Sequence, residues 1–255
     1  MAIDLKLVSQ LRDKTGAGFG DCKLALEEAG NDLDKAVEIM RKKGDLKAAK
    51  KADRAVKEGA VSISGDNQKC AVVALACETD FVSRGDDFKS VVKELSDKLL
   101  SNPEEFVAWA DTRIKELILK IGENIQLAGQ DVFEGPAVGQ YLHTNKKVAG
   151  ICVLDQVNQE TANEIAMQIV AMSPKWLASE DVDTEVLAKE REIYREQLKT
   201  EGKPEQIWDK IIAGKLAKFY EENCLLNQIF IKDDSKKIKD LLAGAKIIAW
   251  TKFSV

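Results

Sequence analysis

Residues Lys69–Gly85, KCAVVALACETDFVSRG, contain the longest uninterrupted apolar run of the chain, from Cys70 to Cys77, and this run decides the fold. Its β-branched and small apolar side chains are typical of a well-buried strand. The preceding segment Ala60–Ser64 alternates apolar and polar residues, and turn residues at Gly65–Asn67 join the two segments. We therefore predict a β-hairpin with a buried second strand, followed directly by a loop.

After this loop the apolar residues change to helical spacing. A helix capped by Asp86 or Asp87 would carry on one face Phe88, Val91, Val92, Leu95 and Leu99. We predict the later elements as follows: helices after Pro103 and around Ile165–Val170, strands at Ile125–Phe133, Gly139–His143, Val148–Leu154, Gln228–Ile231 and Lys246–Phe253, and a helix capped by Ser235. This mixture of helices and strands predicts an α+β fold.

The start of the chain predicts a small bundle of three short helices. Asp4, Asp21 and either Asn31 or Asp32 are placed to cap them, and each is followed by apolar residues at helical spacing. Residues Lys42–Gly44 are typical of a helix end, so we expect the third helix to stop there.

A run of basic residues follows the predicted bundle. Between Lys42 and Lys57 there are seven lysines and arginines. One interpretation is a solvated linker helix, and the alternative is a contact with an acidic or phosphate-bearing surface.

Residues 182–224 change character again, because they are highly charged and poor in Gly and Pro except at Gly202–Pro204. This pattern predicts two helices that fold back as an antiparallel hairpin, a short coiled coil. Its apolar seam, with Val186 and Ile193 before the turn, is thin, so we expect it to project. The predicted domains are a helical domain at 1–55, a first α+β subdomain at 56–140, a second α+β subdomain at 141–181 and 225–255, and the hairpin inserted at 182–224.

Composition excludes several classes of function. The chain has 255 residues with a net charge of −5, which argues against a globally basic nucleic-acid binder. The eight-residue run Cys70–Cys77 is too short to span a membrane, which takes about 18 apolar residues, and no basic region leads into an apolar stretch at the start, so we expect no signal peptide. The five cysteines include no C-x-x-C pair, and the one histidine is His143. We therefore expect reduced thiols, no metal site, no cofactor, no catalytic residues and no enzyme activity.

Two loops remain as candidate binding elements. In Thr79–Val82, the carboxylate of Asp80 precedes the large apolar ring of Phe81. Either Thr79 or Asp80 caps the next turn and Phe81 folds into the core, or the ring protrudes and wedges apart elements of a partner. In Thr15–Phe19, Phe19 either plugs the helical bundle or docks on a partner.

Five stretches of the chain resemble the bacterial-type elongation factor Ts family, the guanine-nucleotide exchange factors of elongation factor Tu. They occur in the family's order over nearly the whole chain, and they are Leu11–Leu26, Cys77–Arg84, Lys120–Ile125, Gly139–His143 and Leu225–Asp233. The resemblance implies a cytoplasmic factor of protein biosynthesis that binds the GDP-bound form of elongation factor Tu, with no membrane contact and no stable nucleic-acid binding. The lack of a transit segment favours a bacterial source.

The resemblance also implies roles for particular residues. The loop of Thr79, Asp80, Phe81 and Val82 would enter the partner near its magnesium ion and switch region and dislodge the ion, so that GDP is released and GTP can load. The first domain would be ubiquitin-associated-like (UBA-like) and would dock on the partner's nucleotide-binding domain. Further partner-binding residues implied in this way are Leu11, Arg12, Gly16, Phe19 and His143, the last on the second subdomain.

Three departures from the family pattern are visible. Ala74 and Ala76 stand where members often carry Glu and Asn, which we expect to loosen the hold on the loop. The chain stops at Val255, where some members continue into a helical module, and Phe19–Gly20 differs from the bulky pair of others.

Two other functions stay open from the residues alone. The basic run Lys42–Lys57 could bind RNA, which would show as steeply salt-dependent binding without a GTPase partner. Alternatively, His143 with nearby carboxylates could serve a small enzyme, which would turn over a substrate without any partner.

Overall fold

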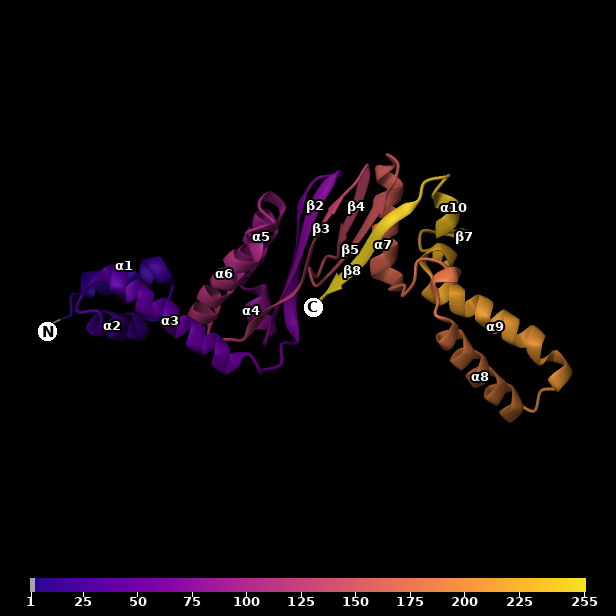
Figure 1. Ribbon diagram of the computed structural model, residues 1–255, viewed down its shortest axis with the longest axis horizontal. Helices are drawn as coiled ribbons and strands as arrows, with labels where there is room; N and C mark the ends of the chain where they lie inside the picture. The colour runs from indigo at the N-terminus through magenta and orange to yellow at the C-terminus, as the bar shows by residue number, and fades with distance from the viewer. Residues whose placement is uncertain (1–2) are drawn as a thin grey trace. The chain divides into compact units, whose positions relative to one another are not determined.

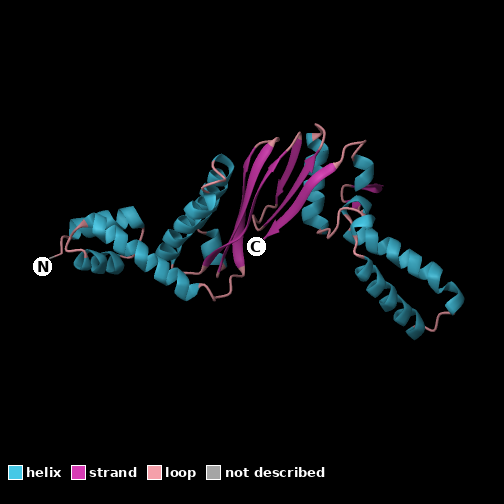
Figure 2. Cartoon of the chain, viewed as in Figure 1, coloured by secondary structure: helices cyan, strands magenta, loops and turns pink. Residues whose placement is uncertain are grey.

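The computed structural model describes residues 3–255 and divides them into two compact units. Met1 and Ala2, which belong to the predicted helical domain, lie outside the described residues. The first unit comprises the chain up to Phe133 together with Leu142–Ala149 and Phe253–Val255, and the second comprises Glu134–Tyr141 and Gly150–Lys252. Both units contain helices and strands, which confirms the α+β class (Figure 2).

The first three helices form a bundle with its own apolar cluster. They are α1 (Leu5–Thr15), α2 (Phe19–Glu28) and α3 (Leu33–Lys51) (Figure 1). Asp4 caps α1 by accepting from the Lys6 amide, and Asp32 caps α3, as predicted. The prediction for the second helix was wrong: α2 begins at Phe19 after Gly18, so Asp21 lies in its first turn and instead binds Lys47 at 2.9 Å.

Helix α3 does not end at Gly44 but continues to Lys51, because one face packs against α6 (Phe106–Ile121). The absence of a side chain at Gly44 brings α3 close to the Lys115 carbonyl, and Lys115 Nζ lies 2.9 Å from the Asp45 carboxylate. Leu119 of α6 joins the apolar cluster of the bundle. The basic run is therefore helical up to Lys51, and Lys42 and Lys50 are exposed as expected of a solvated helix, while another face of α3 packs against α6.

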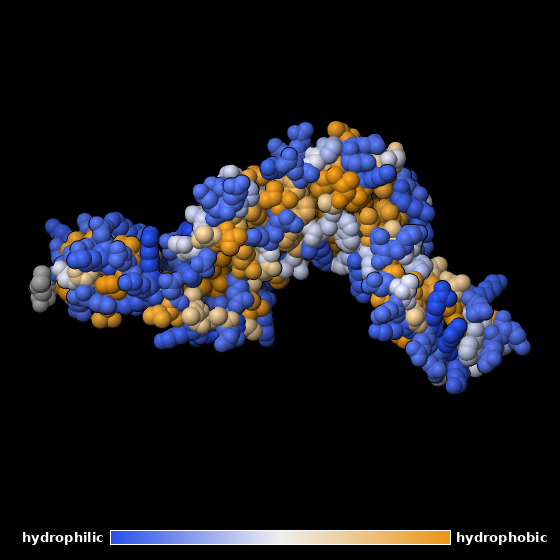
Figure 3. Space-filling view, viewed as in Figure 1, coloured by the Kyte–Doolittle hydropathy of each residue, from blue (hydrophilic) through white to orange (hydrophobic). Residues whose placement is uncertain are grey.

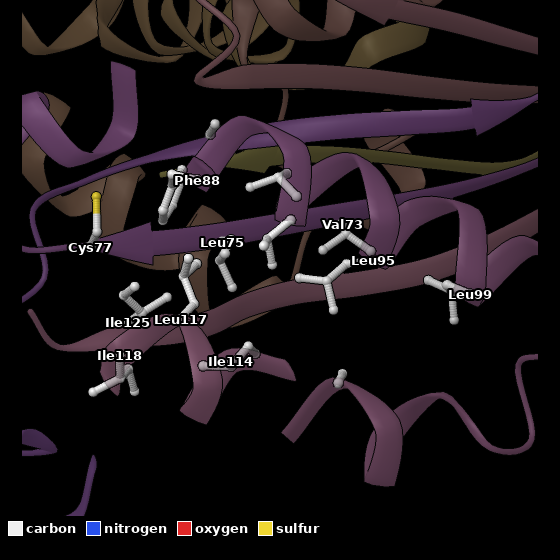
Figure 4. Packing of buried hydrophobic residues seen from close by; sticks show 14 of the residues in the cluster. Val73, Leu75, Cys77, Phe88, Leu95, Leu99, Ile114, Leu117, Ile118 and Ile125 are labelled. Carbon is white, nitrogen blue, oxygen red and sulfur yellow. The ribbon is translucent and has the colours of Figure 1, made fainter. Parts of the chain in front are cut away.

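The first sheet has the strand order β1-β2-β3, with β1 (Glu58–Gly65), β2 (Lys69–Cys77) and β3 (Ile125–Glu134). The predicted hairpin is confirmed, since β1 and β2 pair antiparallel with Gly65 opposite Cys70. Alternate residues of β2 point toward α5 (Asp86–Ser101) and α6. Figure 4 shows Val73 and Leu75 of β2 beside Phe88 and Leu95 of α5 in this cluster.

The second unit is built around a sheet of order β4-β5-β8, which packs with α7 and short C-terminal elements. Its elements are β4 (Ala137–Leu142), β5 (Val148–Leu154), α7 (Gln159–Met172), β6 (Ile229–Phe230), β7 (Asp233–Lys237), α10 (Ile238–Leu241) and β8 (Ile247–Ser254). Ser235 does not cap a helix, because it lies inside β7 and α10 begins after Lys237.

Helices α8 (Thr184–Thr200) and α9 (Trp208–Asn223) pack against each other as a hairpin. The seam consists of Leu198, Ile212 and Leu216, with Leu187 and Tyr194 beside them. Ile193, which the sequence predicted at the seam, is exposed instead. Figure 3 shows that most of the visible surface of the hairpin is hydrophilic. Within residues 3–255, no helix is both long enough and apolar enough to cross a membrane.

The continuation of α3 can be tested at its glycine. We expect Gly44→Ala to raise the free energy of unfolding by about 0.5–1 kcal/mol, because alanine favours a helix interior and the added Cβ would meet its neighbours at 3.7 Å and 4.0 Å, an ordinary contact distance. Urea denaturation followed by circular dichroism measures this.

Gly16→Ala is the matched control. Gly16 ends α1 with φ of 65°, so an alanine there should lower stability by about 1–2 kcal/mol. If both variants were destabilised alike, helix α3 would not pass through Gly44 unbroken.

Candidate functional site

The loop after β2 forms a short helix, α4 (Asp80–Arg84). Thr79 caps it, since its Oγ1 accepts a hydrogen bond from the Val82 amide at 3.4 Å, as the capping interpretation predicted. The same interpretation placed Phe81 in the core, and this was wrong: 86% of Phe81 is exposed. Val82 packs against the apolar core of β2, α5 and α6 instead. Val82 therefore anchors α4, while the phenyl ring of Phe81 faces solvent.

The carboxylate of Glu123 holds the start of this loop. Its Oε2 accepts from the backbone amides of Glu78 and Thr79, both at 3.1 Å, and its Oε1 accepts from the Thr79 hydroxyl at 2.6 Å. Glu123 follows Gly122, which ends α6 with φ of 88°. Hydrogen bonds to a charged acceptor are stronger than neutral ones, so the three that this carboxylate accepts help to fix the direction in which the chain leaves β2.

Glu78 in turn binds the segment that contains Glu123. Its Oε1 accepts from the Asn124 amide at 2.6 Å, and Arg54 Nη1 lies 3.4 Å from the same oxygen. The Asn124 amide hydrogen bond, and then the charge of Arg54, lower the pKa of the Glu78 carboxyl. The Asn124 side chain donates to the carbonyls of Arg54 at 2.7 Å and Ala52 at 3.3 Å, which ties the end of α3 to the same place.

Asp80 and Phe81 lie next to each other on the anchored turn. The Asp80 carboxylate is partly exposed and lies 3.2 Å from Arg84, an exposed pair that contributes little to stability. The Ser83 hydroxyl donates to the Asp80 carbonyl at 3.1 Å, and the Gly85 amide donates to the Val82 carbonyl at 3.0 Å. The turn thus presents one carboxylate and one aromatic ring on a backbone held at both ends.

The thiol of Cys77, beside the loop, is buried. Burial raises the pKa of Cys77 to about 12, and its Sγ donates to the Thr79 carbonyl at 3.3 Å. All five cysteines are buried and free. A reactive cysteine is partly exposed with a lowered pKa, so this arrangement does not support thiol chemistry.

The residues expected at the N-terminal docking surface differ in accessibility. Leu11 is fully buried in the bundle, whereas Arg12 is exposed. Gly16 lets the chain turn after α1, with its Cα facing Lys120. Phe19 is 49% exposed at the start of α2, so the interpretation that it plugs the bundle was wrong. Its docking role stays a prediction.

His143 lies where β4 ends. Its backbone amide donates to the Val148 carbonyl at 2.9 Å, and its carbonyl accepts from the Lys146 amide at 2.8 Å. The stretch Leu142–Ala149, with His143, belongs to the same compact unit as α4. The compact units and the predicted subdomains are therefore different divisions of the chain.

Sequence reasoning missed the residues that position the loop, Glu123 and Asn124. The available signal was the Lys120–Ile125 stretch of the family resemblance, which drew attention to these residues without indicating their contacts. Ala74 and Ala76 are buried in β2. In the part of the chain that the structure describes, no three His, Cys, Asp or Glu side chains come together to hold a metal ion.

Comparisons with known proteins cover nearly the whole chain. The sequence profile of a family described as "Elongation factor TS" matches residues 78–255. A Hydrogenobaculum sp. (strain Y04AAS1) protein named "Elongation factor Ts" is 44% identical over 94% of this chain and 93% of its own length. Proteins of the same name from Halothermothrix orenii and Aquifex aeolicus are 40% and 42% identical, over 100% and 95% of this chain and 93% and 92% of their own lengths.

The hold of Glu123 on the loop can be measured by hydrogen exchange. Glu123→Gln removes the charge that binds two amides and a hydroxyl, a loss of about 1.5–3 kcal/mol for a charged hydrogen bond. We expect the Glu78 and Thr79 amides to exchange roughly ten- to a hundred-fold faster. Glu104→Gln, at an exposed position of the same unit, is the control. If Glu123→Gln left the protection of both amides unchanged, Glu123 would not hold the loop.

The lowered pKa of Glu78 predicts a pH dependence of this junction. Because the folded-state pKa lies below the unfolded one, the stabilisation is complete above the ordinary pKa of a glutamate and is lost as the pH falls through the lowered value. We expect the NMR signal of the Asn124 amide to shift in that acidic range, and the shift to vanish in Glu78→Gln. A midpoint at or above the ordinary glutamate value would contradict the assignment.

Proposed function

Because the chain belongs to the elongation factor Ts family, we propose that it binds GDP-bound elongation factor Tu and releases GDP by disturbing the magnesium ion and the switch region of that partner. Members of this family act as nucleotide exchange factors in translation elongation. No covalent step is needed, and the chain is proposed to act as a binding protein of the cytoplasm rather than as an enzyme.

The observation that carries this proposal is the exposed ring of Phe81. A phenylalanine that is 86% exposed gains little from the folded chain, but burial in a partner would contribute about 1.5–3 kcal/mol. The ring sits on a turn held by Glu123 and Val82, so little conformational entropy is lost on insertion. This arrangement supports a preformed wedge.

The carboxylate of Asp80, next to Phe81, supports the proposed effect on the magnesium ion of the partner. Asp80 would enter the partner beside the ring, where a negative charge near Mg²⁺ and its ligands competes with the groups that hold the ion. When the magnesium ion leaves, the negative charge of the GDP phosphates is no longer neutralised, and GDP binds more weakly. A thousandfold weaker hold on GDP corresponds to about 4 kcal/mol of coupling. Linkage makes the coupling reciprocal, so nucleotide weakens the binding of this chain to the same extent, and GTP loading helps to release it.

The other surfaces would extend the interface. In the proposal the three-helix bundle is a UBA-like domain that docks on the nucleotide-binding domain of the partner, with Arg12 and Phe19 in contact. Leu11 and Gly16 act indirectly, because one is buried in the bundle and the other shapes the turn after α1. His143 would contact a further partner domain, and the α8–α9 pair would be the coiled coil of the family.

Phe81→Ala tests the wedge. We expect the stimulated release of a fluorescent GDP from elongation factor Tu, followed by stopped flow, to slow by about ten- to a hundred-fold, since the 1.5–3 kcal/mol of ring burial acts on the release step. Affinity for the partner should fall less. Val107→Ala, which shortens a side chain 65% exposed on α6 of the same unit, is the control. An unchanged release rate in Phe81→Ala would exclude the ring from the mechanism.

A further inference from the structure

A cavity of about 410 Å³ in the first unit is lined by positively charged side chains. Its walls come from the start of β1, the end of α4, the first turn of α5 and the turn between β4 and β5. The charged residues in the lining are Arg84, Lys89, Lys146 and Lys147, and no Asp or Glu lines it. The volume lies within the roughly 300–1,000 Å³ typical of small-molecule sites.

Two of these four cations have no acidic partner. Lys147 pairs with Glu58, and Arg84 pairs with Asp80. Among residues 3–255 no carboxylate lies within ion-pair distance of Lys89 or Lys146. Two lysines without a carboxylate partner thus line one concave space, and an anion with two or more charges could pair with both of them.

The turn that carries the lysines is fixed before any ligand arrives. The Lys146 carbonyl accepts from the Val61 amide of β1 at 2.7 Å, and the Lys147 carbonyl accepts from the Val255 amide at 3.1 Å. Asn145 Oδ1 accepts from the Lys147 amide at 2.9 Å, which leaves the Asn145 side-chain NH₂ as a donor. Because the backbone of this turn is already held, ordering the turn adds little to the entropy cost of binding.

We propose that this cavity binds the phosphate groups of a small polyphosphate anion, as free pyrophosphate or as the diphosphate of a nucleotide. Phosphate chemistry fits because Arg84 can bind two oxygens of one group while Lys89 and Lys146 supply point charges to others. A single carboxylate of a protein segment carries one charge and would leave one lysine uncompensated. The site includes Arg84 at the end of α4 but neither Asp80 nor Phe81, and the proposal does not rest on the proposed function.

An occupant would also act on helix α4. Arg84 pairs with Asp80 at 3.2 Å and lines the cavity, so an anion that binds Arg84 competes with Asp80 for it. The Asp80 carboxylate would then be released from its intramolecular partner. Anion binding and the availability of Asp80 are thus coupled, and the coupling is the same in both directions.

Isothermal titration of the whole chain with pyrophosphate, without any partner, tests the site. We expect saturable binding of one anion per chain, stronger than that of inorganic phosphate, and at least about tenfold weaker binding in the double variant Lys89→Gln/Lys146→Asn. Asparagine suits position 146, where φ is 56°. The double variant Lys42→Gln/Lys50→Gln removes the same charge from exposed lysines of α3 and should bind like the parent.

A parallel titration with GDP distinguishes the two sources of the anion. Tighter binding of GDP than of pyrophosphate would identify a nucleotide diphosphate as the ligand, equal affinity would show that the cavity recognises the diphosphate from either source, and binding of pyrophosphate alone would identify free polyphosphate. The proposal is overturned if pyrophosphate does not saturate, if sulfate at equal ionic strength displaces it equally well, or if the cavity variant binds as tightly as the α3 variant.

Discussion

The carboxylate of Glu123 satisfies two backbone amides at the point where the chain leaves the buried strand β2. A partly buried amide without a partner costs free energy, so this acceptor stabilises the outward turn of the chain at Thr79. The outward turn is what places Phe81 in solvent while Val82 reaches the core. The surface that the proposed function requires therefore depends on the half-buried side chain of Glu123.

This junction also joins three separate segments of the first unit. Glu78 accepts from the Asn124 amide, and Asn124 binds the carbonyls that follow α3. The end of the first helical bundle, the end of α6 and the end of β2 are thus fixed by one group of polar contacts. The packing of α3 on α6, with Leu119 in the cluster of the bundle, adds an apolar contact between the same segments. A partner that contacted both Arg12 and Phe81 would therefore bind α1 and α4, two helices that the packing of α3 on α6 connects.

The exposed aromatic ring and the basic cavity lie at opposite ends of one short helix. Phe81 is near the start of α4 and Arg84 is its last residue, and Arg84 pairs with Asp80, the first residue of the helix. The Asp80–Arg84 ion pair is exposed and therefore weak, so little free energy is lost when the two side chains bind other partners instead. An acidic group and a basic group that restrain each other in the free chain can each find a stronger partner in a complex.

The sequence by itself determined the types of most elements, the β1–β2 hairpin, the cap at Asp4 and the family, and it narrowed two further caps to pairs that include Asp32 and Thr79. These depend on periodicity, turn residues and hydrogen bonds between near neighbours, which a linear pattern records. Only the tertiary structure decided that α3 passes through Gly44, that Phe81 and Phe19 are exposed, and that Glu123 binds Thr79 from 44 residues away. Burial and such distant contacts depend on which surfaces the other elements cover, so no local pattern could reveal them.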